Sequence, residues 1–282
     1  MRFAINVPNF GEFGEARTLI DLARAAEDHG WDGFFIWDHI YTFDEKSGGE
    51  LPMADPFTTL AAIATETKRI RIGALVTPLP RRRPWKLARE AVTVDRLAGG
   101  RLILGAGIGW NAWGEYSRFG EDPSERLHGE MLDEGLAILT GLWTGEPFSF
   151  QGKHYTIQQS RFLPTPVQSP RIPIWLAAGL PPHRPVRRAA RWDGICPISN
   201  ETITVESIID MLRVIREERD AALPFDVVLA GFTGDKDKDE AAEFLARYAE
   251  AGVTWWQEGF WHNDPASFAL ERIRRGPPEL PS

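Results

Sequence analysis

Short apolar runs rich in β-forming residues alternate with longer segments of helical period along the whole chain. The expected strands are residues 3–7, 33–37, 70–76, 102–106, 173–177, 193–197, 226–231 and 253–257. The expected helices are residues 15–29, 56–67, 84–98, 123–143, 182–191, 205–221, 238–251 and 265–274. Regular alternation of strand and helix predicts a parallel sheet with helices outside it. Eight such pairs favour an α/β fold of the (β/α)8 type, a closed TIM barrel.

Three Asp-Pro pairs stand where helices are expected to begin: Asp55-Pro56, Asp122-Pro123 and Asp264-Pro265. Aspartate favours the N-cap of a helix, and proline favours its first position. Glu125 follows Asp122 by three residues, a spacing typical of a capping box. We therefore expect each aspartate to cap the helix that follows it.

Two segments interrupt the alternation. Residues 40–54 read as a loop after the second strand, and residues 145–172 read as a β-hairpin leading into a Pro-rich connector. No linker or repeat divides the chain, so residues 1–282 are expected to form one barrel domain with these two insertions. The first insertion follows the C-terminal end of a strand, where barrel active sites are built.

Composition excludes several classes of protein. The net charge of −8, from 40 acidic against 32 basic residues, argues against a nucleic-acid binder, which needs a basic face. The single cysteine, Cys196, excludes a disulfide scaffold. No apolar run approaches the roughly 20 residues that span a bilayer, and the first residues lack the pattern of a signal peptide. We expect a cytoplasmic protein that acts on a small molecule.

The residues that follow the expected strands are rich in glycine and aromatic side chains and poor in charge. The sequence has no H-E-x-x-H, C-x-x-C or G-x-S-x-G motif, so neither a metal site nor a hydrolase nucleophile is predicted. A glycosidase needs two carboxylates that face one bond. Glu115 and Glu258 are candidates, but nothing in the sequence brings them together.

The run Gly105 to Trp110 resembles a dinucleotide-binding motif, but Trp110 occupies the position of the motif's third glycine. We interpret the glycines as a bare backbone against which a flat ligand lies. The alternative is a glycine-rich turn that binds nothing.

Several segments together resemble the bacterial luciferase-like flavin- and deazaflavin-dependent oxidoreductases. Their order and spacing carry the resemblance, which covers essentially the whole chain. The matching segments are Gly33 to His39, Asp55-Pro56, Ile72 to Pro78, Pro84 to Glu90, Asp95 to Trp110, Gly152 to Tyr155, Pro173 to Gly179, Arg188 to Gly194 and Arg272 to Pro278. The resemblance implies a (β/α)8 barrel, usually a homodimer, that binds FMN or coenzyme F-420 at its C-terminal mouth. The reaction it implies is hydride or oxygen transfer on a small organic substrate.

Carried over position by position, the resemblance assigns roles near the strand ends. Asp38 and His39 match an Asp-His pair in which the histidine donates a proton, and a neighbour such as Asp38 is expected to tune its protonation. The alternative is that His39 merely fills the loop. Thr77 matches a residue that contacts the cofactor ring, and the Ala74–Leu75 bond falls where deazaflavin-dependent members carry a non-prolyl cis peptide.

Further cofactor contacts are expected after the fourth and fifth strands, from Gly107, Ile108, Asn111 and Ala178. A turn that takes the cofactor phosphate near a helix N-terminus is expected at Gly179, Leu180, Pro182 and His183. The residues expected to line the substrate pocket are Phe43, Trp110, Trp113 and Trp261, which favour an apolar or aromatic substrate. The alternative for the tryptophans is packing in the core.

Two departures keep the cofactor and the chemistry open. Trp110 stands where some deazaflavin-dependent sugar-phosphate dehydrogenases carry a glutamate that accepts the proton. Gly179 is followed by Leu-Pro-Pro instead of the Ser-rich phosphate loop of many FMN monooxygenases. The alternatives to an F-420-dependent enzyme are an FMN-dependent monooxygenase, a non-catalytic flavin-binding protein on the same fold, and a cofactor-free barrel hydrolase or lyase.

Overall fold

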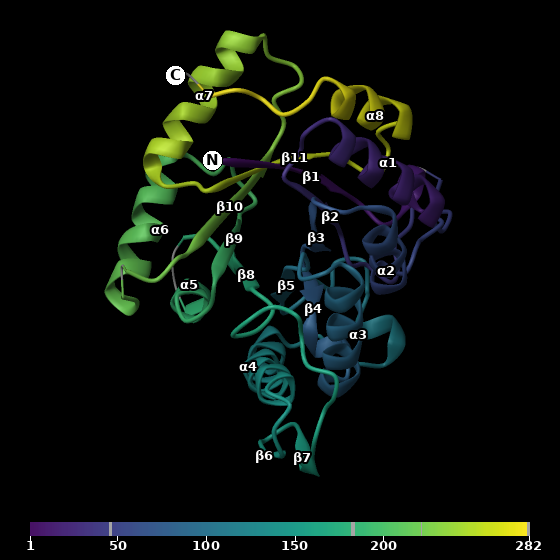
Figure 1. The fold of residues 1–282 in the computed structure, drawn as a ribbon, viewed down its shortest axis with the longest axis vertical. Helices are drawn as coiled ribbons and strands as arrows, with labels where there is room; N and C mark the ends of the chain where they lie inside the picture. The colour runs from purple at the N-terminus through teal and green to yellow at the C-terminus, as the bar shows by residue number, and fades with distance from the viewer. Residues whose placement is uncertain (45–46, 182–183, 221, 281–282) are drawn as a thin grey trace.

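A computed structural model describes residues 1–44, 47–181, 184–220 and 222–280. Nine strands form a sheet in the order β3-β2-β1-β11-β10-β9-β8-β5-β4, and every pairing in it is parallel. The strands are β1 (Arg2–Val7), β2 (Gly33–Ile36), β3 (Arg71–Ala74), β4 (Thr77–Pro78), β5 (Leu104–Gly107), β8 (Ile174–Gly179), β9 (Gly194–Ile198), β10 (Asp226–Gly231) and β11 (Trp255–Gly259). Figure 1 shows the strands around a centre with the helices outside them.

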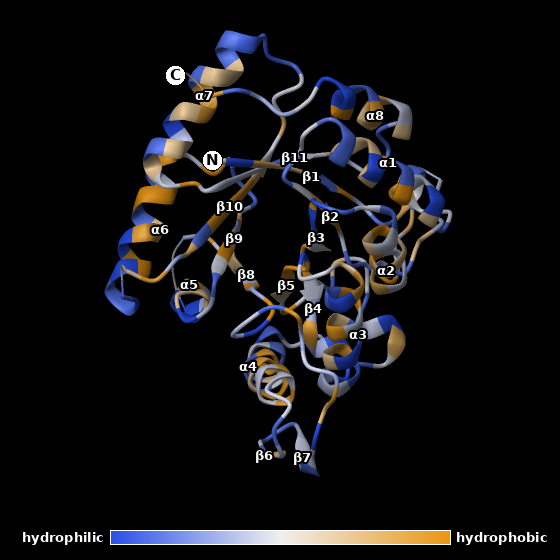
Figure 2. Cartoon of the chain, in the orientation of Figure 1, coloured by the Kyte–Doolittle hydropathy of each residue, from blue (hydrophilic) through white to orange (hydrophobic). Residues whose placement is uncertain are grey.

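The helices follow the expected alternation. They are α1 (Ala16–Asp28), α2 (Pro56–Glu66), α3 (Pro84–Leu97), α4 (Glu125–Trp143), α5 (Arg184–Ala189), α6 (Val205–Glu218), α7 (Lys238–Ala251) and α8 (Ala266–Arg274). Figure 2 shows apolar and polar residues alternating along outer helices such as α6 and α7, as amphipathic helices on a barrel require. Among the described residues, no helix is long and apolar enough to cross a membrane.

The sheet closes on itself where the third expected strand meets β5. That strand is split into β3 and β4, but Ile72 still pairs with Leu102, and the Ile103 amide donates to the Ile72 carbonyl at 2.9 Å. The predicted α/β barrel is therefore confirmed.

The non-prolyl cis bond lies at Leu75–Val76, one residue later than the resemblance placed it. The Ala74–Leu75 bond, to which the resemblance pointed, is not among the cis bonds of the described residues. The Leu75 amide donates to the Ile36 carbonyl at 2.8 Å, so the hydrogen bonding to β2 continues as far as Leu75.

Apolar side chains fill the barrel and also the layer between the sheet and the helices. The inner group is Ala4, Phe35, Leu75, Ile103, Trp175, Val228 and Trp255. Each large side chain buried here contributes about 1.5–3 kcal/mol to folding relative to exposure. The lower barrel is therefore a packed core, which leaves only its mouth for ligands.

Only one of the three expected aspartate caps forms. Asp55 accepts a hydrogen bond from the Thr58 amide at 2.8 Å and caps α2, as predicted. Asp122 instead accepts from the amide of Ser124, which is the actual cap of α4, so the expected capping box is absent. Asp264 accepts from the Trp261 amide at 2.7 Å. At both positions the aspartate carboxylate accepts a hydrogen bond from an amide that precedes the helix, and not from an amide of the first helical turn.

The two insertions take different forms. Residues 145–172 contain the antiparallel hairpin of β6 (Phe148–Gln151) and β7 (Thr156–Ser160), which projects below α4 in Figure 1. Glu134 of α4 holds this hairpin by accepting backbone hydrogen bonds, including one of 2.7 Å from the Lys153 amide. In residues 40–54, isolated bridges join Phe10 to Met53 and Phe43 to Glu50.

A buried ion pair joins the last strand to the last helix. Arg272 of α8 places Nη2 2.7 Å from Oε1 of Glu258, at the end of β11. The Thr233 amide donates to the same carboxylate at 2.9 Å, and the Arg272 guanidinium also lies over the ring of Trp31. Glu258 is thus a structural residue, which pairs with Arg272 and Thr233 and not with Glu115.

We predict that Arg272→Ala lowers the free energy of unfolding by about 3–5 kcal/mol, because it leaves the Glu258 carboxylate buried without its cation. Arg275→Ala on the same helix is the matched control. Its partner Glu271 is 67% exposed, so the loss there is expected to stay below about 1 kcal/mol. Urea denaturation measures both, and equal losses would contradict a structural role for the buried pair.

Candidate active site

Aromatic side chains from four strand ends gather around His39 at the C-terminal mouth of the barrel. The His39 ring lies 5.0 Å from Trp113, 5.4 Å from Phe10 and 5.9 Å from Trp37, measured between ring centroids. Trp110 contacts Trp113 at 5.3 Å, and Trp261 contacts Trp37 at 5.9 Å. We call Phe10, Trp37, Trp110, Trp113 and Trp261 the aromatic shell.

His39 is held at its ring and at its backbone. Its Nδ1 lies 2.9 Å from Oε2 of Glu115, a buried residue of the loop after β5. The Asn9 side chain accepts from the His39 amide and donates to the His39 carbonyl. The imidazole therefore has one defined position at the mouth, which is what a proton-transfer residue needs.

The protonation of Glu115 determines which nitrogen of His39 is free. Burial raises the pKa of Glu115, but the hydrogen bond and charge of His39, the charge of Arg81 and the Ile40 amide together bring it below its ordinary value. Glu115 is then a carboxylate that only accepts, so His39 Nδ1 donates to it. Nε2 is left as the ring nitrogen that can exchange a proton with a ligand.

Two arginines neutralise the carboxylates beneath the shell. Arg81, in the 3-10 helix η2 (Leu79–Arg81), places Nη1 2.7 Å from Glu115 and Nη2 2.9 Å from Asp38. Arg82 places Nη2 2.8 Å from the other oxygen of Asp38. The carboxylate beside His39 is thus Glu115, and the expectation that Asp38 fills this position is wrong. Arg81 and Arg82 hold the Asp38 carboxylate, and Glu115 holds the His39 ring.

Sequence reasoning missed Glu115, Arg81 and Arg82 as site residues. The sequence pattern suggests Glu115 only as half of a glycosidase pair with Glu258, and Glu258 is paired with Arg272 instead. A usable signal was present. An arginine run follows the third strand and an acidic residue follows the fourth, both on the side of the barrel that carries His39.

The glycines of β5 make room for the chain itself. A Cβ on Gly105 would lie 2.4 Å from a Leu75 methyl carbon, and one on Gly107 would lie 3.0 Å from a Val76 methyl carbon. Gly109 has a φ of +77°, which a residue with a side chain rarely adopts. Close packing of the third strand therefore accounts for these glycines, and the interpretation that they leave space for a ligand is not needed.

Three other expected cofactor residues have structural contacts. The Ile108 carbonyl accepts from the Tyr116 hydroxyl at 2.7 Å, and Asn111 accepts from the Tyr116 amide at 2.9 Å. Both contacts shape the loop that carries Glu115. Ala178 is buried in the layer beneath the helices. Thr77 differs, because its buried hydroxyl has no hydrogen-bond partner among the described residues.

The expected substrate residues separate into two groups. Trp110 and Trp261 are 57% and 66% exposed, so core packing does not account for them, while Trp113 is half-buried. Phe43 lies outside the aromatic shell. It contacts Tyr41 and pairs with Glu50 in the loop of residues 40–54.

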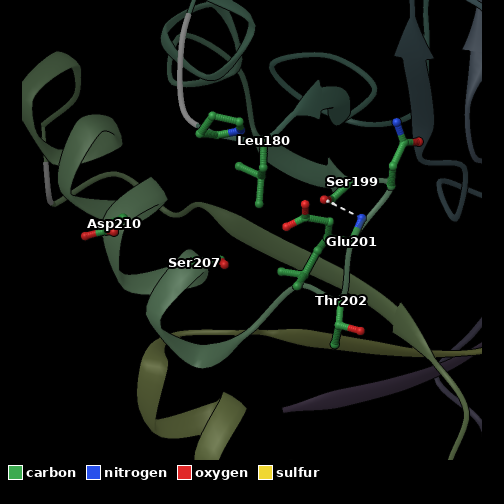
Figure 3. Close-up of a pocket in the computed structure, with 9 residues that line it drawn as sticks. Leu180, Ser199, Glu201, Thr202, Ser207 and Asp210 are labelled. Carbon is green, nitrogen blue, oxygen red and sulfur yellow. Dashed lines mark hydrogen bonds between the residues drawn. The ribbon is translucent and has the colours of Figure 1, made fainter.

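The expected phosphate turn borders a pocket of about 360 Å³ at the ends of β8 and β9. Figure 3 shows Leu180, Ser199, Glu201 and Thr202 around it, with Ser207 and Asp210 contributed by α6. A Cβ on Gly179 would meet no atom of the described residues within 4 Å, so these residues leave the space at this strand end open. Pro182 and His183 lie outside the described residues.

Comparisons with known proteins agree with this architecture. Residues 1–275 match a family model described as luciferase-like monooxygenase. The chain belongs to the luciferase-like monooxygenase family. An uncharacterized protein of Mycobacterium tuberculosis (strain ATCC 25618 / H37Rv) is 32% identical over 264 residues, which cover 86% of each chain. An F-420-dependent glucose-6-phosphate dehydrogenase of Gordonia bronchialis is 33% identical over 170 residues, 59% of this chain and 48% of that enzyme.

Solved structures show the same fold at lower identity. An F-420-dependent secondary alcohol dehydrogenase, in complex with an F-420-acetone adduct, superposes with a TM-score of 0.81 at 16% identity, covering 97% of both chains. The FMN-bound oxygenating constituent of 3,6-diketocamphane monooxygenase from Pseudomonas putida gives 0.75 at 17% identity over 100% of both. This luciferase-like protein therefore has relatives that use F-420 and relatives that use FMN.

The depressed pKa of Glu115 predicts how stability depends on pH. A carboxyl whose pKa is lower in the folded protein stabilises it above the unfolded pKa of about 4.3, and this contribution disappears as the pH falls through the folded pKa. The stability advantage over Glu115→Gln should be present above about pH 4.3 and be lost as the pH falls through the folded pKa. Urea denaturation at a series of pH values measures it, with exposed Glu271→Gln as control. An advantage that does not change with pH would be inconsistent with a depressed pKa.

Proposed function

We propose that this chain is an oxidoreductase that binds coenzyme F-420 or FMN at the barrel mouth and uses His39 as its proton donor or acceptor. The observation that carries the proposal is the bond between His39 Nδ1 and buried Glu115, inside the aromatic shell. The cofactor would supply the redox chemistry. The protein would position the substrate, exclude water from the site and supply or accept a proton.

Residues at the mouth fit a flat cofactor with a phosphate. The unpartnered hydroxyl of Thr77, on β4, offers a hydrogen bond that the described residues do not use. Gly179 leaves the end of β8 open, and Ser199, Thr202 and Ser207 offer hydroxyl groups in the pocket beside it. Thr77 would hold the ring of the cofactor, and the hydroxyl groups beside Gly179 would hold its phosphate.

The remaining steps belong to the chain itself. Glu115 and Asn9 fix the ring and backbone of His39, so Nε2 is the atom that passes a proton to, or takes one from, a substrate oxygen. A ligand bound against the surrounding rings would restrict water around this nitrogen, which would strengthen its hydrogen bond to a substrate. A positioned general acid or base of this kind contributes about 10²–10⁴-fold to a rate.

One observation favours FMN over F-420. The described residues that line the pocket of Figure 3 include the carboxylates of Glu201 and Asp210 and no lysine or arginine. These carboxylates repel the phosphate of either cofactor, and the tail of F-420 adds glutamate carboxylates to that charge, so the repulsion is smaller for FMN. The His39–Glu115 pair, in contrast, suits the proton transfer that accompanies hydride transfer with F-420.

A paired titration with F-420 and FMN, followed by fluorescence, decides the cofactor. Tight binding of one with weak binding of the other assigns it, and binding of neither overturns the proposal. Turnover with pre-reduced cofactor on a panel of alcohols, aldehydes and ketones separates an enzyme from a flavin-binding protein.

Gly179→Glu should weaken cofactor binding at least about tenfold, because like charges a few ångströms apart near a protein surface repel by about 1–4 kcal/mol. The new side chain meets open space, so the fold should tolerate it. Gly179→Ala, which adds no charge, is the control and should retain affinity. Unchanged affinity in Gly179→Glu would show that the phosphate lies elsewhere.

His39→Asn should lower kcat about 10²–10⁴-fold while the cofactor Kd changes by less than about threefold, because only the proton path is removed. His154→Asn is the matched control, since His154 also bonds a glutamate, Glu130, but on the hairpin away from the mouth. Steady-state kinetics and cofactor titration supply the two values. Equal effects of the two substitutions would refute the role of His39.

A further inference from the structure

We propose that the aromatic shell is a substrate-binding wall that takes a neutral, planar, apolar molecule with one hydroxyl or carbonyl oxygen, such as an aromatic alcohol or ketone. The binding site stands on the geometry of the shell, whereas turnover of that substrate rests on the proposed function. The residues that determine specificity are Trp110 and Trp261, with Trp113 and Trp37 behind them.

The apolar surface runs without a break from solvent to His39. Trp110 comes from the loop after β5 and Trp261 from the loop after β11, and both are exposed. Each contacts a second tryptophan, Trp113 or Trp37, that in turn contacts the His39 ring. Large exposed aromatic side chains that adjoin a polar catalytic candidate are typical of a ligand site.

The rings are arranged to leave faces available. Trp110 meets Trp113 at 66° and Trp37 meets Trp261 at 86°, so both pairs are edge-to-face and not stacked. Edge-to-face pairs leave ring faces that a planar ligand can stack on, and each such contact is worth about 0.5–1.5 kcal/mol beyond the area it buries. A flat molecule therefore fits this wall better than a puckered sugar does.

The charges beneath the wall cancel. Asp38 and Glu115 are paired with Arg81 and Arg82, and Glu115 also accepts from His39. Neither guanidinium of this group is left for a substrate phosphate.

One further cation near the shell is also engaged. Arg118, on the loop after β5, lies over the ring of Tyr41 and donates to the Trp113 carbonyl. His262 contacts Phe10 at 5.3 Å, on the side of Phe10 next to β11. A sugar phosphate would bury several hydroxyl groups against rings, and each one left unpaired costs about 1–3 kcal/mol. A substrate with a single oxygen needs one partner, which His39 Nε2 provides.

Binding to the protein without cofactor tests the wall directly. Isothermal titration with 2-acetylnaphthalene, a neutral aromatic ketone, is compared with glucose 6-phosphate. We expect the ketone to bind at least tenfold more tightly, and Trp110→Ala and Trp261→Ala each to weaken it about two- to tenfold, the loss of one stacking contact. Trp261→Phe should restore most of the affinity. Trp85→Ala, at an exposed tryptophan of α3 that packs on Tyr155, should change nothing.

Tighter binding of glucose 6-phosphate, or equal effects of Trp85→Ala and Trp261→Ala, would overturn the proposal that the aromatic shell binds the substrate. Kinetics separate this failure from failure of the proposed function. If ketone binding depends on Trp261 but neither reduced cofactor supports turnover, the redox function is rejected and the aromatic binding wall is supported. If glucose 6-phosphate is turned over in a way that depends on His39, the aromatic binding wall is rejected and the redox function is supported.

Discussion

The bridge that Arg81 makes between two buried carboxylates is the interaction on which the mouth of this barrel depends. One guanidinium bonds Asp38, at the end of β2, and Glu115, in the loop after β5, while itself lying on η2. Buried charges remain ionised only when they are paired and hydrogen-bonded. The bridge therefore fixes three separate loops relative to one another, and the position of His39 follows from the position of Glu115.

That bridge requires the third strand and β5 to lie close together, and the packing inside the barrel meets this requirement. Gly73, Gly105 and Gly107 carry no side chain where a Cβ would collide with the neighbouring strand. The inner layer below them is filled by Phe35, Trp175 and Trp255. A rigid, close-packed base thus supports a mouth whose charges are neutralised and whose outer surface is aromatic.

Prediction from sequence was accurate where the determining interactions are local. Hydrophobic period located every helix and strand of the barrel to within a few residues, and Asp55 capped α2 as expected. It failed where two local partners compete, as at Asp122 and Asp264, since a loop amide and a helix amide are equally near in sequence. It also failed for the partner of His39, because the adjacent residue Asp38 is paired with Arg81 and Arg82, and Glu115 lies 76 positions along the chain.

The sequence alone determined the barrel, the placement of His39 at its mouth and the family, because strand–helix alternation and motif order are properties of the linear chain. Tertiary structure alone decided that Glu115 and not Asp38 orients His39, and that Trp110 and Trp261 face solvent while Trp31, Trp175 and Trp255 are buried. The physical reason is that charge pairing and burial depend on which strand ends the barrel brings together. Residues far apart in the sequence become neighbours only when the sheet closes.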